Sequence, residues 1–229
     1  MPDETRESQY QHCINVQKEF GSTPLGLMTN QCFHDDPRRL PIMLSRYKFV
    51  AKMLSGCGKA LEIGCGDGFA SRIVLQEVKE LVATDFDPVF VKNVNANMDK
   101  FWTFQCFAHD MLSGPVPGAP YDAAYALDVL EHIAPEHEDA FLKNTVKSLA
   151  PHGIAIFGMP SLQSQAYAST LSKQGHVNCK DGVEFKTFFQ RFFQNVFVFS
   201  MNDEVVHTGY YPMAHYLLAL GCGPKNEIA

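Results

Sequence analysis

A glycine-rich turn between two patterned runs constrains the fold of this chain more than any other feature. The segment 61–68 reads Leu-Glu-Ile-Gly-Cys-Gly-Asp-Gly; it follows a predicted strand at 60–63 and precedes a predicted helix at 69–78. Glycine lets the backbone turn tightly and approach a ligand closely, because no Cβ intrudes. A strand, a glycine turn and a helix in this order indicate a nucleotide-type site in an α/β fold.

An acidic residue follows at the spacing such a site requires. Asp85 ends a second predicted strand, at 81–84, about 20 residues after Gly64. A carboxylate there could accept hydrogen bonds from both hydroxyls of a ribose. Gly64 and Gly66 would bring the backbone against the same ligand.

Two kinds of ligand compete for this motif. A dinucleotide site has the pattern G-x-G-x-x-G, but here Phe69 occupies the place of the third glycine. Glu62 also precedes the first glycine, where its charge would repel a pyrophosphate but could help to hold a cationic amine through an ordered network. The residues therefore favour a zwitterionic ligand over NAD.

Apolar runs and helical patterns alternate through the rest of the chain. Further strands are predicted at 102–108, 123–127 and 154–159, with helices at 40–54, from Pro88 and at 136–149. This alternation predicts a parallel sheet with helices on both faces. The last third contains a predicted helix at 183–193 and two more strands, at 196–201 and 215–221.

These features together resemble the class I S-adenosylmethionine-dependent methyltransferases. The resemblance covers about residues 39–159 and includes the glycine motif, Asp85, Asp110 after the third strand, and the run 128–132, Asp-Val-Leu-Glu-His. It implies a Rossmann-like α/β fold with a seven-stranded, mostly parallel sheet, one antiparallel strand, helices on both faces and an N-terminal helical lid. The cofactor it implies is S-adenosyl-L-methionine.

The resemblance also implies roles for individual residues. Asp85 would bind the ribose, Asp110 the adenine amino group and the Met111 backbone the adenine ring, while Leu127 and Asp128 would border the methionyl end. We interpret Cys65 as a small residue that fits the turn, not as a nucleophile. The predicted cofactor-binding residues are Glu62, Gly64, Cys65, Gly66, Gly68, Asp85, Phe86, Asp110, Met111, Leu127 and Asp128.

The acceptor side is expected along two connections, 160–182 and 202–214, that leave the carboxyl edge of the sheet. A hydroxyl acceptor benefits from a base with a pKa near neutrality, and histidine is the natural candidate. His176 is the first choice, followed by His132 and His207. The alternative for each is a hydrogen-bonded loop histidine with no catalytic part.

No metal is predicted, because no short ligand spacing supports one. A group formed by His176 and His207 with Asp203 or Glu204 is the alternative. The seven cysteines contain no CxxC pair and are expected to be reduced thiols.

Composition limits the partners. The formal net charge of −6 and the absence of a basic run argue against nucleic acid. The polar N-terminus and the lack of a long apolar run predict no signal peptide and no membrane span, hence a cytoplasmic protein.

We therefore expect a single methyltransferase domain over residues 1–229. It would comprise an arm or lid at 1–36, a cofactor-binding core at 37–159, and acceptor-side loops with a terminal β-pair at 160–229. The expected reaction is methyl transfer to a small or medium-sized acceptor, with O-methylation of a biosynthetic intermediate such as a sugar as the first choice. The alternatives are a non-catalytic S-adenosylmethionine-binding regulatory module and a protein or N-methyltransferase. The expected partners are the small-molecule acceptor and, as a homodimer, a second copy of the chain.

Overall fold

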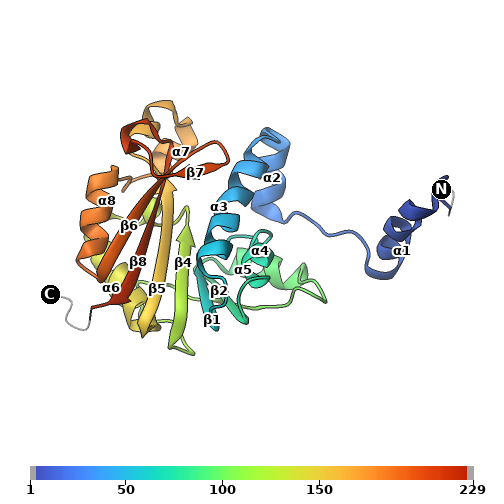
Figure 1. Cartoon of the computed structure of the whole chain (residues 1–229), viewed down its shortest axis with the longest axis horizontal. Coiled ribbons are helices and arrows are strands. Elements are labelled where there is room, and N and C mark those ends of the chain that lie inside the picture. Colours follow the sequence, from blue (N-terminus) through green and yellow to red (C-terminus); the bar gives the residue numbers. More distant parts are fainter. Residues whose placement is uncertain (1–3, 226–229) are drawn as a thin grey trace.

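The structure, a computed structural model, describes residues 4–225 and contains one eight-stranded sheet (Figure 1). The strand order is β3-β2-β1-β4-β5-β8-β6-β7. The strands are β1 (Lys59–Ile63), β2 (Glu80–Asp85), β3 (Gln105–Ala108), β4 (Tyr121–Leu127), β5 (Leu149–Pro160), β6 (Phe193–Asn202), β7 (Val205–His207) and β8 (Tyr216–Pro224). The α-helices are α1 (Gln11–Phe20), α2 (Leu27–Asp35), α3 (Arg39–Met53), α4 (Ser71–Leu75), α5 (Pro88–Ala96), α6 (Glu138–Ser148), α7 (Thr170–Gly175) and α8 (Gly182–Gln190). The 3₁₀ turns are η1 (Ser8–Tyr10), η2 (Leu130–His132), η3 (Pro135–His137), η4 (Gln163–Tyr167) and η5 (Tyr211–Met213).

The first five strands run parallel, and β8 pairs antiparallel with both β5 and β6. This confirms the predicted Rossmann-like α/β fold. The sheet has one strand more than expected, because Val205–His207 turns back at Asp203 (φ 49°) and pairs antiparallel with β6. The predicted long connection at 202–214 thus begins as a hairpin at the sheet edge.

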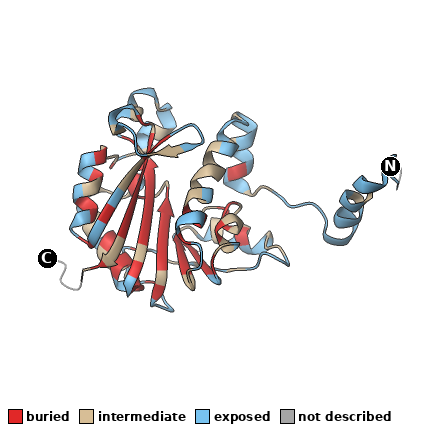
Figure 2. Ribbon diagram, viewed as in Figure 1, coloured by how far each residue is buried: buried red, intermediate tan, exposed pale blue. Residues whose placement is uncertain are grey.

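Successive side chains of a strand point to opposite faces of the sheet, so the central strands contribute to a core on each face. These strands are buried along most of their length (Figure 2). Phe157 and Ala219 pack with α6 and α8 on one face, whereas Ile156 and Leu218 pack with α3 and α4 on the other. The phenylalanines of α8, of the turn after it and of early β6 belong to the first of these cores: Phe185, Phe188, Phe189, Phe192 and Phe193.

Two predicted elements are shorter than expected. Helix α4 ends at Leu75, because the chain then turns so that Lys79 and Glu80 donate backbone hydrogen bonds to the carbonyl oxygen of Gly58. Strand β3 begins only at Gln105, because Asp99 accepts backbone hydrogen bonds from residues 101 and 102 and holds that stretch in a turn.

The N-terminal arm divides into two parts. Helix α1 has no buried residue and projects away from the sheet (Figure 1); Phe20 at its end packs edge-on against Phe101, with ring centroids 5.0 Å apart. Helix α2 instead lies beside α3, and its Thr29 is buried. The predicted arm at 1–36 begins outside the described residues, and its boundary stays a prediction. Within residues 4–225, no helix is both long and apolar enough to cross a bilayer.

Candidate active site

A cavity of about 630 Å³ opens at the carboxyl ends of β1, β2 and β4. This is the edge at which open α/β sheets bind their ligands. Its walls come from α2, α3, the glycine turn, the loops after β2 and β3, and the segment after β4. Of the eleven predicted cofactor-binding residues, nine line it: Gly64, Cys65, Gly66, Asp85, Phe86, Asp110, Met111, Leu127 and Asp128.

The glycine turn closes one side of the cavity through backbone conformations that favour glycine. Gly64 has φ 74° and Gly66 has φ 54°. A Cβ at Gly64 would lie 2.5 Å from Val129, and one at Gly66 would lie 2.7 Å from the Met28 sulfur. Glycine suits both positions because the backbone is left-handed there and because a neighbouring side chain lies where a Cβ would be.

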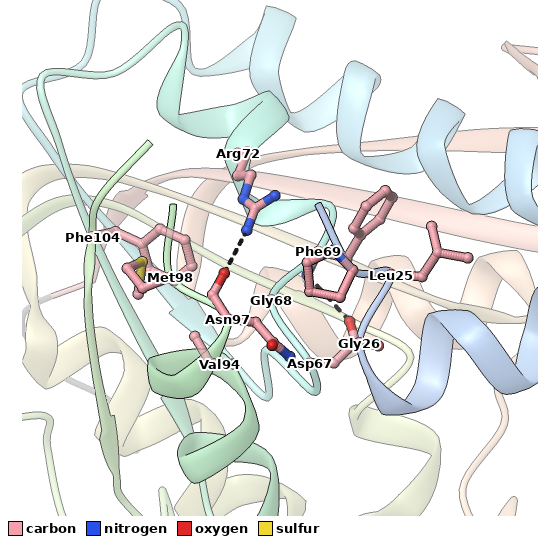
Figure 3. Close-up of a pocket in the computed structure, with 11 residues that line it drawn as sticks. Leu25, Gly26, Asp67, Gly68, Phe69, Arg72, Val94, Asn97, Met98 and Phe104 are labelled. Carbon is pink, nitrogen blue, oxygen red and sulfur yellow. Dashed lines mark hydrogen bonds between the residues drawn. The ribbon is translucent and has the colours of Figure 1, made fainter. Parts of the chain in front are cut away.

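Gly68, also predicted to bind the cofactor, lies behind the glycine turn. It does not line the large cavity but faces a hollow of about 10 Å³ behind the turn (Figure 3). A Cβ on Gly68 would meet Val94 and Phe104 at 3.1–3.2 Å, and the nearby Arg72 guanidinium donates to the Asn97 carbonyl at 2.9 Å. Because this hollow has room for about one water, we interpret Gly68 as a packing residue.

Asp85 lies at the end of β2 and is 6 % exposed. One carboxylate oxygen accepts the Gly66 N–H and the other accepts the Asp87 N–H, each at 2.9 Å. Burial raises the pKa of Asp85, and these backbone hydrogen bonds act in the opposite direction. Each oxygen keeps acceptor capacity that two ligand hydroxyls could use.

Glu62 lies outside the cavity, beneath the glycine turn. Its carboxylate accepts the Tyr47 hydroxyl at 3.0 Å and the Tyr125 hydroxyl at 2.8 Å. Desolvation by burial raises the pKa of Glu62 to about 7. Since Tyr47 does line the cavity, Glu62 is connected to it through a hydroxyl, as the proposed ordered network requires.

Asp67 is a functional candidate that the sequence analysis missed. Its carboxylate accepts the Thr29 backbone N–H at 2.6 Å and the Thr29 hydroxyl at 3.1 Å. These hydrogen bonds fasten α2 to the glycine turn and hold Met28 over the cavity. The one available signal was an acid inside the glycine motif.

The methionyl end predicted at Leu127 and Asp128 contains an ion pair. Asp128 adopts φ 57°, and its carboxylate accepts a hydrogen bond from the Arg46 guanidinium at 2.6 Å. Arg46 also stacks on the Tyr216 ring, 3.7 Å from the ring centroid. A carboxylate and a guanidinium thus lie together at the end of β4. Arg46 was not predicted, because its partner is distant in sequence.

The adenine end predicted at Asp110 and Met111 follows β3. Asp110 is exposed and accepts the Leu112 N–H at 2.9 Å, while Met111 is buried. Asn144 of α6 donates to the Met111 carbonyl at 2.8 Å and holds this loop in place. Phe86 and Leu112 add apolar surface to the cavity wall here.

Two of the three candidate histidines lie together, and the third lies elsewhere. His132 lines the cavity, and His176 packs edge-on against it with ring centroids 5.2 Å apart. His207 sits on the edge strand β7, where both ring nitrogens are engaged, one with Asn202 and one with the Gly209 N–H. The structure therefore separates His207 from the other two.

Among the described residues, the members of the alternative metal site, His176 and His207 with Asp203 or Glu204, do not converge. Over residues 4–225, the ligand atoms that converge belong to Glu131, His132 and His176. Glu131 was not a candidate in the sequence analysis.

The structure thus has a Rossmann-like sheet with a cavity at its carboxyl edge. Residues 60–153 match the family model described as "Methyltransferase domain". This match covers less than half of the chain, and over these residues the chain resembles the class I S-adenosylmethionine-dependent methyltransferases.

The chain is also similar to curated proteins over part of its length. A probable S-adenosylmethionine-dependent methyltransferase of Mycobacterium tuberculosis (strain ATCC 25618 / H37Rv) is 23% identical over 101 residues, which are 44% of this chain and 35% of that protein. The chain thus matches about a third of the length of this relative.

Solved structures share the fold. The N-methyltransferase NodS from Bradyrhizobium japonicum WM9 with S-adenosyl-L-homocysteine has a TM-score of 0.63 at 20% identity, covering 84% of this chain and 91% of that one. The plantazolicin methyltransferase BpumL, also with this product, has a TM-score of 0.63 at 13% identity, covering 83% and 87%.

Proposed function

We propose that this protein transfers the methyl group of S-adenosyl-L-methionine to a small or medium-sized acceptor. The observation that carries the proposal is that one cavity runs from Asp85, at the end of β2, to His132, beyond β4. It therefore combines a site for a nucleoside with a histidine-lined opening for a second reactant. Its volume lies within the range usual for small-molecule sites.

The adenosine part of the donor matches the β2–β3 side. The Asp85 carboxylate would accept the ribose hydroxyls, and charge-assisted hydrogen bonds of this kind are among the stronger ones. Asp110 would accept from the adenine amino group, with the Met111 backbone against the ring. The apolar side chains of Phe86 and Leu112 suit the faces of a purine.

The methionyl part matches the glycine turn and the end of β4. Its amino and carboxylate groups are of opposite charge, as are Asp128 and Arg46. The Arg46 Nε atom is buried without a hydrogen-bond partner in the part of the chain that the structure describes, so this guanidinium retains donor capacity. Tyr47, whose hydroxyl donates to Glu62, lines this cavity and could accept a hydrogen bond from the amino group.

The sulfonium would then direct its methyl group toward His132 and His176. Methyl transfer is an in-line displacement, in which the enzyme contributes mainly proximity and orientation. We infer that the two imidazoles position or activate the acceptor and that a hydroxyl, such as that of a sugar intermediate, is the preferred nucleophile. An amine acceptor is the second candidate, since histidine can also remove its proton.

The partners follow from the same site. A net charge of −6 does not favour a nucleic acid, and a small-molecule acceptor suits a cavity of this size. The homodimer and the single domain over 1–229 stay predictions.

Calorimetry with S-adenosylmethionine, followed by an assay for S-adenosylhomocysteine, tests this function. Acceptor pools rich in hydroxyls and pools rich in amines are supplied separately. We expect donor binding, and turnover that depends on the hydroxyl pool. Donor binding without turnover on either pool would support the non-catalytic regulatory module instead, and absence of donor binding would contradict the proposal.

A further inference from the structure

We propose that Glu131, His132 and His176 bind a divalent transition-metal ion beside the methyl-donor cavity. Each residue offers one ligand atom, and the three atoms lie within 4.8 Å of one another. Ligands around a tetrahedral zinc ion are separated by about 3.4 Å when the bonds are about 2.1 Å long. Small side-chain rotations would therefore complete the site.

Two backbone hydrogen bonds bring the distant third residue to the pair. The N–H groups of Val177 and Asn178 both donate to the Glu131 carbonyl, at 2.8 Å and 3.0 Å. They tie the segment after α7 to η2, which holds Glu131 and His132. The backbone of the two residues that follow His176 thus fixes its position.

Each imidazole is oriented by an oxygen that can only accept. The Nδ1 atom of His132 lies 2.9 Å from the Gly175 carbonyl, and that of His176 lies 2.9 Å from Oε1 of Gln165. Gln165 directs its amide nitrogen to the Ser161 carbonyl, which leaves Oε1 for His176. Both Nδ1 atoms therefore carry the proton, and both Nε2 lone pairs are available. Metal-binding histidines are held in this way by their second nitrogen.

Glu131 provides an independent observation. Its side chain is 0 % exposed, and neither carboxylate oxygen has a hydrogen-bond partner among residues 4–225. The buried carboxylates of Glu62, Asp67 and Asp85 all accept hydrogen bonds. A buried carboxylate without a partner is costly, and a bound cation would remove that cost.

The donor set indicates the class of metal. One carboxylate and two neutral imidazoles suit Mn²⁺, Fe²⁺, Co²⁺ or Zn²⁺, whereas an all-oxygen set would suit Mg²⁺ or Ca²⁺. Three protein ligands leave at least one position open, as in catalytic zinc sites. This departs from the expectation that the protein holds no metal, and it uses neither His207 nor the acids at 203–204.

The open position gives the ion a role that rests on the proposed function. His132 lines the cavity, so an acceptor hydroxyl could bind the ion next to the donor. The ion would lower the pKa of that hydroxyl, as metals do for bound water. The O–H proton leaves to solvent, the oxygen forms a bond to the methyl carbon, and the carbon–sulfur bond breaks. Its electron pair stays on sulfur, which gives neutral S-adenosylhomocysteine.

The test is direct metal binding to chelator-treated full-length protein, without donor or acceptor. Mn²⁺ is titrated and followed by the loss of the free-ion signal in electron paramagnetic resonance, because thiols prefer softer metals and the seven cysteines should not compete. Zn²⁺ is measured in parallel against a chromophoric chelator. We expect one site per chain, and affinity at least tenfold lower in Glu131→Gln and in His176→Ala.

Two further variants sharpen this test. Gln165→Ala removes the partner of His176 together with the hydrogen bonds of Gln165 to Ser161 and Ser164, keeps all three ligands, and should lower affinity by about tenfold, as for other supporting residues. His137→Ala alters an exposed histidine in η3, outside the group, and should leave affinity unchanged.

The proposal is overturned if neither metal binds, or if Glu131→Gln and His176→Ala bind both metals as the unmodified protein does. Circular dichroism and S-adenosylhomocysteine calorimetry verify that each variant is folded. Loss of metal binding in a variant that binds S-adenosylhomocysteine normally supports the site. Because metal binding is measured without donor, a failure to bind S-adenosylmethionine would contradict the proposed function and not the metal site.

Discussion

The backbone N–H of Gly66 donates a hydrogen bond to the Asp85 carboxylate, with 2.9 Å between nitrogen and oxygen. This contact joins the glycine turn after β1 to the end of β2, so the two sequence motifs form one wall of the cavity. A change at either residue should therefore affect the donor site.

Replacing Asp85 tests the ribose contact. Asp85→Ala should weaken S-adenosylmethionine binding by about 1–3 kcal/mol, because the donor hydroxyls lose a charged acceptor. Calorimetry measures the change. Asp87→Ala is the matched control: Asp87 caps α5 through the Val89 N–H, so its loss should lower stability and spare affinity. Affinity of Asp85→Ala equal to that of the unmodified protein would remove Asp85 from the site.

Gly66→Val should be more damaging than Asp85→Ala. Gly66 has φ 54°, and a Cβ there would lie 2.7 Å from the Met28 sulfur over the cavity. The left-handed conformation alone costs a non-glycine residue about 1–2 kcal/mol. S-adenosylhomocysteine affinity and thermal unfolding are measured together. Gly56→Ala, at φ 85° with open space around it, should lose stability only. A folded Gly66→Val protein with full affinity would contradict the donor site.

Glu62 should make stability depend on pH. Burial raises its pKa to about 7 from the ordinary value of 4.5, so the folded state holds a proton that the unfolded state releases. The resulting stabilisation is complete below about pH 4.5 and is lost as pH rises to about 7, by up to about 3 kcal/mol.

Glu62→Gln isolates this contribution. The amide keeps partners for both Tyr47 and Tyr125 but does not titrate. Urea unfolding of both proteins at pH 5 and pH 7 should show a smaller loss of stability in the variant. Equal losses would show that Glu62 does not titrate in this range.

His176→Ala should lower kcat by roughly 10²–10⁴ and leave donor affinity almost unchanged. Burial lowers the pKa of His176 below its ordinary 6.5, chiefly by desolvation, with the neighbouring His132 adding to the effect. The rate should therefore rise with pH through a value below 6.5, since only the neutral imidazole can act as a base or bind a metal.

The other histidines provide the comparison, measured with the acceptor that the pool assay identifies. His132→Ala should reduce kcat comparably, while His207→Ala should change it little, because both ring nitrogens of His207 are engaged on β7. A large loss in His207→Ala with normal activity in His176→Ala would reverse our assignment of the acceptor side.

Much of the fold could be predicted because its signals are local. Alternating strands and helices over 60–159 indicated a parallel sheet, and the structure confirms it. The boundaries of α4 and β3 were less predictable, since they depend on contacts with Gly58 and Asp99 outside the periodic pattern. Strand β7 was missed because three residues carry too little pattern to mark a strand.

The sequence itself determined the side of the cavity at which we propose that the donor binds. Gly64, Gly66 and Asp85 lie at the ends of adjacent parallel strands, so strand order alone brings them to one edge. Only the tertiary structure decided the acceptor side. His176 reaches His132 through main-chain hydrogen bonds to Glu131, and α2 reaches the cavity through Thr29 and Asp67. Such contacts join segments far apart in the chain and depend on how loops pack, which no short-range periodicity encodes.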